Sequence, residues 1–91
     1  MIKLYSKSEL YDNVIGFFNI GHKSYEVEVW GGNSFRYYND RNSHSKASYV
    51  IRIDNFPGRT KVIKRGYGKD FKSAKENAQK AIEKLKHNKR R

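Results

Sequence analysis

Apolar and polar residues alternate most clearly over residues 24–30, SYEVEVW. Tyr25, Val27 and Val29 occupy every second position, and Trp30 lies on the other face with the charged residues. A period of two predicts a strand with one buried face. The Gly pair that follows is expected to form a tight hairpin turn, because both central positions of such a turn can need positive φ.

The same alternation and the turn residues between runs predict further strands. The predicted segments are residues 34–38, 49–54 and 59–65. On the second of these, Arg52 faces away from Tyr49, Ile51 and Ile53. Residues 39–48 predict an exposed loop, Pro57 and Gly58 suit a turn, and Gly66-Tyr67-Gly68 is expected to end the last strand.

The N-terminal pattern allows two interpretations. Ser6 and Glu9 have the spacing of a capping box, and the apolar residues that follow recur at helical intervals, which favours a helix over residues 7–18. The run from Val14 to Phe18 is rich in β-branched and aromatic residues, so a strand pairing with residues 24–30 across Gly21-His22 is the alternative.

The C-terminal segment predicts a helix over residues 74–87. Ser73 and Glu76 form a second capping-box pattern, with Ser73 as the expected N-cap. One narrow apolar stripe at helical spacing contains Ala74, Ala78, Ala81, Ile82 and Leu85. Its three Ala residues should allow the helix to lie close to a sheet.

Together these elements predict an α+β domain, with a small antiparallel sheet of three to four strands packed against a C-terminal helix and, on the favoured interpretation, an N-terminal helix. Residues 1–88 are expected to form one domain, and residues 89–91 a basic tail. The chain has no Cys and no long apolar run or signal-like N-terminus. We therefore expect a cytoplasmic protein with no membrane association, cofactor or metal.

The charge distribution adds a functional expectation. The net charge is +11, of which residues 1–58 contribute +1 and residues 59–91 contribute +10. Such a concentration destabilises a small fold by self-repulsion unless a polyanion compensates it. Nucleic acid is the polyanion that interspersed Lys, Arg and Gly favour, although surplus lysine can also serve solubility alone.

Three groups of residues are candidate contacts with nucleic acid. Those on the fourth predicted strand, beside the Gly turn and at the helix start are Arg59, Lys61, Lys64, Arg65, Lys69, Lys72 and Lys75. The Gly turn and the helix N-terminus are expected to approach a phosphate. Candidate base readers or stacking platforms are Trp30, Arg36, Tyr37 and Arg52, although core packing is the commoner role for an aromatic residue.

The chain resembles two families of nucleic-acid-binding domain. Residues 71–78, FKSAKENA, resemble the strand-to-helix junction of the arm-type DNA-binding domains of phage and transposon integrases and of plant ethylene-response proteins. This resemblance implies that the sheet lies in the DNA major groove, with Arg52, Arg59, Lys61 and Lys64 near DNA.

Residues 66–68 and 72–75 also resemble the Gly-x-Gly turn and the basic start of the last helix of the double-stranded RNA-binding domain. That family has the order helix, three strands, helix, and the resemblance implies phosphate contacts by Lys72 and Lys75. The two resemblances leave duplex DNA and duplex RNA both open, with DNA favoured.

No catalytic pattern is present, so we expect no enzyme and no small-molecule substrate. His22, His44 and His87 share no ligand spacing, and there is no Walker loop or serine elbow. The alternative function is an inhibitor. The short chain, rich in Lys, Asn, Ile and Tyr, is typical of small genes of AT-rich bacteria and their phages, which often encode blockers of host defence nucleoproteins of the anti-CRISPR type.

Overall fold

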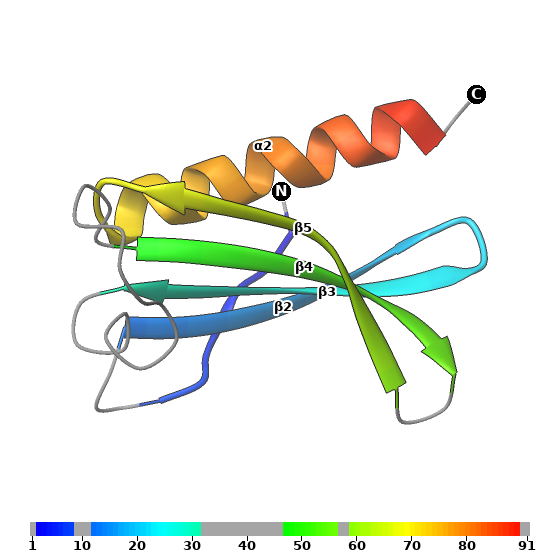
Figure 1. Ribbon diagram of the computed structural model, residues 1–91, viewed down its shortest axis with the longest axis horizontal. Helices are drawn as coiled ribbons and strands as arrows, with labels where there is room; N and C mark the ends of the chain where they lie inside the picture. Colours follow the sequence, from blue (N-terminus) through cyan, green and yellow to red (C-terminus); the bar gives the residue numbers. More distant parts are fainter. Residues whose placement is uncertain (1, 9–11, 32–46, 57–58, 90–91) are drawn as a thin grey trace.

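The computed structural model describes residues 2–8, 12–31, 47–56 and 59–89. It has an α+β architecture in which an antiparallel sheet carries a C-terminal helix on one face (Figure 1). The described strands follow one another in the order β1-β2-β3-β4-β5, so each lies beside its neighbour in sequence. The strands are β1 (Tyr5–Ser6), β2 (Asp12–Ile20), β3 (Lys23–Gly31), β4 (Ala47–Phe56) and β5 (Arg59–Gly68). The sheet therefore has five described strands, more than the three to four predicted.

The predicted helix over residues 7–18 is wrong, and the strand alternative is correct. Residues of β2 pair with β3 from Ile20 opposite Lys23 to Asp12 opposite Gly31. Gly21 has a positive φ of 61° at the first position of the two-residue turn, as in a type II′ hairpin. Pairing of the whole β-branched and aromatic run with β3 outweighs the local capping signal.

One face of the sheet holds the core. Alternate residues of β3 and β4, including Val27, Val29 and Ile51, are fully buried there, as the alternation predicts. The helix α2 (Phe71–Lys89) supplies Ala74, Ala78 and Ile82 to the same core. The predicted apolar stripe is thus confirmed, and Figure 1 shows the helix lying along this side of the sheet.

The helix begins three residues earlier than predicted, and Asp70 rather than Ser73 is its N-cap. Asp70 Oδ1 accepts a hydrogen bond from the Ser73 backbone N–H at 2.7 Å, and the Asp70 carbonyl accepts one from Ala74 N–H at 2.9 Å. The hydrogen bonds from Ser73 hold the pKa of the Asp70 carboxyl below its ordinary value. Ser73 is therefore the third residue of the helix. Asp70, not Ser73, supplies the side-chain oxygen that accepts a hydrogen bond from a free backbone N–H of the first turn.

The strand β5 continues through Gly66 and Gly68, which were expected to end it. A Cβ on Gly66 would lie 2.2 Å from the Tyr49 ring, and a Cβ on Gly68 would lie 2.4 Å from the Ala74 backbone nitrogen. These glycines are therefore required for close packing, not for a turn. They let the core ring and the first turn of the helix approach the strand.

The N-terminal segment closes one side of the space between helix and sheet. Ile2 and Leu4 pack against the core, and the backbone of Ile2 exchanges two hydrogen bonds with the Gln79 side chain, at 3.1 and 3.3 Å. This seals the flank of α2 that faces β2. No described residue closes the opposite flank, which faces β5, in the same way.

The remaining sequence predictions fall on residues that the structure does not describe. These are Gly32, the strand over residues 34–38, the loop over residues 39–46, the turn at Pro57-Gly58 and the final two residues of the basic tail. Gly31, expected in a two-residue turn with Gly32, is instead the last residue of β3 and pairs with Asp12 of β2 and Ala47 of β4, so that expectation is wrong. Ala47 and Ser48, expected in the loop, belong to β4, and Lys89 is the last residue of α2.

Candidate functional site

A groove runs between β5 and the flank of α2 that the N-terminal segment leaves open. Two adjoining hollows make it up, with volumes of about 300 and 370 Å³, and they share Lys64, Ala81 and Lys84. We call this the basic groove. Its described lining residues are Tyr25, Tyr49, Ile51, Ile53, Ile63, Lys64, Tyr67, Asn77, Lys80, Ala81, Lys84, Leu85 and Asn88.

The helix contributes one polar flank to this groove. Asn77, Lys80, Lys84 and Asn88 follow one another at intervals of three or four residues, so they lie along one side of α2. That side borders the apolar stripe, since Ala81 and Leu85 also line the groove. The acidic residues of the helix lie on other positions, and no Asp or Glu lines the described part of the groove.

A β-bulge in β5 adds a lysine from the sheet. The register shifts between Ile51 and Arg52, so Ile51 pairs with Lys64 while Ile53 pairs with Lys61. Residues directly opposite in an antiparallel pair share a face, so both lysines lie on the helix side of the sheet. Regular alternation would place them on opposite faces, and the extra residue, Ile63, brings them together.

The lysines of the basic groove keep their charge available. The described ion pairs join Lys7 to Glu28 and Arg52 to Glu26 and Glu28, and none involves Lys64, Lys80 or Lys84. Burial raises the pKa of the Tyr49 phenol, so this groove residue stays neutral at neutral pH. The groove therefore presents uncompensated positive charge above an apolar floor.

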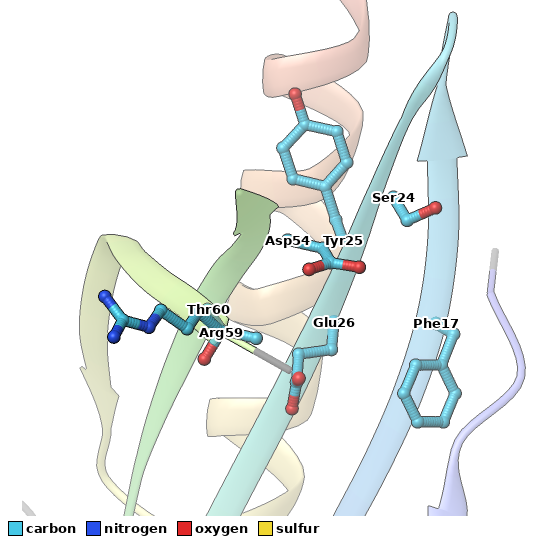
Figure 2. A pocket seen from close by; sticks show the side chains of 7 residues that line it. All are labelled: Phe17, Ser24, Tyr25, Glu26, Asp54, Arg59 and Thr60. Atoms are coloured by element: carbon cyan, nitrogen blue, oxygen red, sulfur yellow. The ribbon is translucent and has the colours of Figure 1, made fainter. Parts of the chain in front are cut away.

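The predicted contact residues on β5 separate onto different surfaces. Lys64 lies in the basic groove, with Lys61 on the same face of the sheet. Arg65 pairs with Val50 and so lies on the face turned away from α2, which we call the opposite face. Arg59 borders a second hollow there, its guanidinium pointing away from the carboxylates of Glu26 and Asp54 (Figure 2).

The predicted base-reading residues are not assembled into one surface. Arg52 lies on the opposite face as predicted, but its Nη1 is 3.2 Å from a Glu26 carboxylate oxygen and 3.0 Å from a Glu28 one. Trp30 lies on that face too and is only 7% exposed, with the Arg52 guanidinium 6.0 Å from its ring centroid. Its burial matches core packing, the commoner role for an aromatic residue, and not an exposed stacking platform. Arg36 and Tyr37 lie outside the described residues.

The phosphate site predicted at the helix start lacks both an open glycine turn and a free helix N-terminus. Gly68 is buried against Ala74, and the Asp70 carboxylate already caps the helix N-terminus. Lys69 and Lys72 are exposed there, and the Lys75 ammonium lies 4.6 Å from the Phe71 ring centroid. An anion at this point would meet the carboxylate first.

Sequence reasoning missed Asn77, Lys80, Lys84 and Asn88 as a set. The signal was present, because these residues follow helical spacing beside the predicted apolar stripe. What the chain alone did not reveal is that β5 would lie along this flank.

Comparison with protein-family models, with curated proteins and with solved structures gives no match.

Two further features bear on chemistry. Among residues 2–8, 12–31, 47–56 and 59–89, no three His, Cys, Asp or Glu side chains gather in a way that could hold a metal ion. Within the same ranges, no helix has both the length and the apolar character needed to cross a membrane.

Proposed function

We propose that the protein binds nucleic acid, with the sugar–phosphate backbone lying along the basic groove. The observation that carries this proposal is that Lys64, Lys80 and Lys84 line one groove free of described carboxylates. Lysine ammonium groups bind phosphate as point charges and release counterions when they do so. The binding surface is then the middle and end of the helix with β5, not the helix start.

The geometry of α2 suits a row of phosphates. Lys80 and Lys84 are one turn apart, about 6 Å along the helix axis. Phosphates of one duplex strand are spaced by ~3.4 Å along the duplex axis, so this interval spans about two nucleotides. Lys64 approaches from the sheet side, so the strand would be held from two sides.

Edge protection is the competing explanation for part of this charge. Lysines on an edge strand discourage pairing with other chains, and the β-bulge does the same, which accounts for Lys61 and Lys64 without any ligand. Lys80 and Lys84 lie on the helix, where no strand edge needs protection. Their alignment with Lys64 therefore favours ligand binding.

Duplex DNA is the ligand we propose first, with duplex RNA as the alternative. The double-stranded RNA-binding domain begins with a helix, whereas residues 12–20 here form a strand. The arm-type DNA-binding domains place a sheet in the major groove. In this chain the sheet face that is free to enter a groove is the opposite face, which carries Glu26, Glu28 and Asp54. We therefore propose contact through the helix side of the sheet instead.

The test compares two triple variants that remove equal charge. We expect Lys→Gln at Lys64, Lys80 and Lys84 to lower the log–log salt slope of duplex binding by about 2.7, since each phosphate contact contributes about 0.9. The matched control changes Lys69, Lys72 and Lys75 at the helix start and should alter the slope much less.

Binding is measured with labelled duplex DNA and duplex RNA over a salt series. A wild-type protein that binds neither would overturn the proposal. Equal slopes for the two triple variants would remove the groove from it. Nuclease-resistant capture of one acidic protein partner, with no affinity for either duplex, would favour the inhibitor function instead.

A further inference from the structure

The larger of the two hollows in the basic groove, which we call the wider stretch, has features that a backbone-binding surface does not need. Its volume is about 370 Å³, at the lower end of the range for small-molecule sites. Ile51, Ile53 and Ile63 from the sheet and Leu85 from the helix give it apolar walls. Phosphates do not require such walls, so this stretch fits an apolar part of a ligand.

A buried hydroxyl is the second feature of this stretch. Tyr25 lines it, is only 3% exposed, and its Oη has no hydrogen-bond partner among the described residues. The ring stacks on Phe18, with centroids 5.1 Å apart and planes at 9°, which fixes its direction. Figure 2 shows it pointing toward the helix, opposite to Glu26, its neighbour on β3.

A buried hydroxyl without a partner is unfavourable, and a ligand with a polar atom at this point would satisfy it. The hydroxyl is closed to solvent in the free protein, so such a ligand reaches it by displacing the side chains that cover it. The ligand must also carry negative charge, because Lys64 and Lys84 border the same stretch together with the Asn88 amide. A small ring with a polar edge and an attached phosphate meets all three requirements. That description is a nucleotide.

We propose that this stretch accepts one unpaired nucleotide of the bound nucleic acid. The base lies between the Ile63 and Leu85 side chains, the Tyr25 hydroxyl bonds to a polar atom on the base edge, and Lys64 and Lys84 hold the flanking phosphates. The inference rests on the proposed function and names its ligand more narrowly. A base that is already unpaired is favoured, because extracting a paired base costs unstacking energy.

The test uses a duplex with a single unpaired 2-aminopurine and the same duplex fully paired. We expect the wild-type protein to bind the bulged duplex more tightly and to change the 2-aminopurine fluorescence. Tyr25→Phe keeps the stacked ring and removes the hydroxyl, and it should lower the preference for the bulge by roughly 3- to 10-fold, as expected for one hydrogen bond.

Tyr5→Phe is the matched control, because Tyr5 is an exposed tyrosine of β1 that does not line the basic groove, and it should leave the preference unchanged. Ile63→Trp is a second variant at a position that is 39% exposed, so it should fill the stretch without disturbing the core. It should abolish both the fluorescence change and the preference for the bulged duplex.

The outcomes separate this inference from the proposed function. Equal affinity for the two duplexes with no fluorescence change would overturn the inference and leave the proposed function standing. Absence of binding to both would overturn both. Displacement of the bulged duplex by oleate but not by a free nucleotide would assign the apolar stretch to an acyl chain and overturn the inference as well.

Discussion

Two hollows of similar volume lie on the two faces of the sheet, and their charges differ. The wider stretch of the basic groove, at about 370 Å³, is bordered by Lys64 and Lys84. The hollow on the opposite face, at about 330 Å³, is bordered by Glu26 and Asp54 as well as Arg59. An anion would find unopposed cations only at the first.

The difference lies in pairing, not in the number of basic residues. On the opposite face, Glu28 is only 3% exposed and accepts hydrogen bonds from Lys7 at 2.9 Å, Arg52 at 3.0 Å and Asn13 at 3.2 Å. The paired cations Lys7 and Arg52 are therefore part of the fold. In the basic groove the cations lie on top of an apolar interface and are not needed to hold it together.

The strongest test of this contrast is a change in the apolar interface itself. Ile82 is fully buried between α2 and the sheet, so Ile82→Ala should lower the free energy of unfolding by roughly 2–5 kcal/mol. The loss should be the same at pH 7 and at pH 3, because no titrating group is involved. Urea unfolding at both pH values measures it, and a loss below about 1 kcal/mol would contradict the proposed role of the interface.

A smaller loss, and one that depends on pH, is expected for the opposite face. Burial raises the pKa of Glu28, but the hydrogen bonds from Lys7, Arg52 and Asn13 together outweigh it and hold the pKa below its ordinary value of 4.5. A carboxyl with a lowered pKa stabilises the fold above its unfolded-state pKa, and this contribution disappears as the pH falls through the folded-state value.

Glu28→Gln should therefore destabilise the protein by roughly 1–3 kcal/mol at pH 7 and by less at pH 3, which lies below the ordinary pKa of the carboxyl. Glu83→Gln, at an exposed position of α2, is the matched control and should change the stability little at either pH. Unfolding curves that show the same loss for Glu28→Gln at both pH values would contradict the role assigned to its ion pairs.

The smallest effect on stability is expected in the basic groove. Each Lys→Gln change at Lys64, Lys80 and Lys84 should alter the free energy of unfolding by no more than about 0.5 kcal/mol, since these side chains have no described ionic partner. The same variants should show the largest loss of nucleic-acid binding. A marked destabilisation would instead make these lysines structural.

Much of the fold could be predicted from local patterns. The alternation around Val27 and around Ile51 identified β3, β4 and the buried face of each, and the spacing of Ala74, Ala78 and Ile82 identified the helix and its packing side. These patterns report which side of an element is apolar. A strand or helix with one apolar side has to bury that side.

The N-terminal error shows where local patterns mislead. The capping signal at Ser6 concerns one hydrogen-bonding site, whereas the register from Asp12 to Ile20 against β3 satisfies a nine-residue strand. Gly16 adds a constraint that is not local, because a Cβ there would lie 2.7 Å from the Lys3 carbonyl oxygen. The competing strand becomes favourable only once its partner is in place.

The candidate site shows the same limit. The spacing of Lys80 and Lys84 along one side of the helix can be seen in the sequence. Lys64 lies on the same side of the sheet as this helical flank only because of the bulge at Ile63. In contrast, Arg52 was placed on the correct face, yet the pairing of β3 with β4 puts it directly opposite Glu26 and so neutralises it. Strand register, which no single segment specifies, decides which cations remain available.

The amino-acid sequence by itself determined the α+β class, the apolar faces of the strands and helix, and the accumulation of positive charge after residue 58. Those properties depend on residue type and on spacing within one element. Only the tertiary structure decided which cations are paired, that Gly66 and Gly68 admit a ring and a helix turn, and that one flank of α2 stays open. Each of these depends on contacts between segments distant in sequence, and such contacts exist only after the strands and helix have packed.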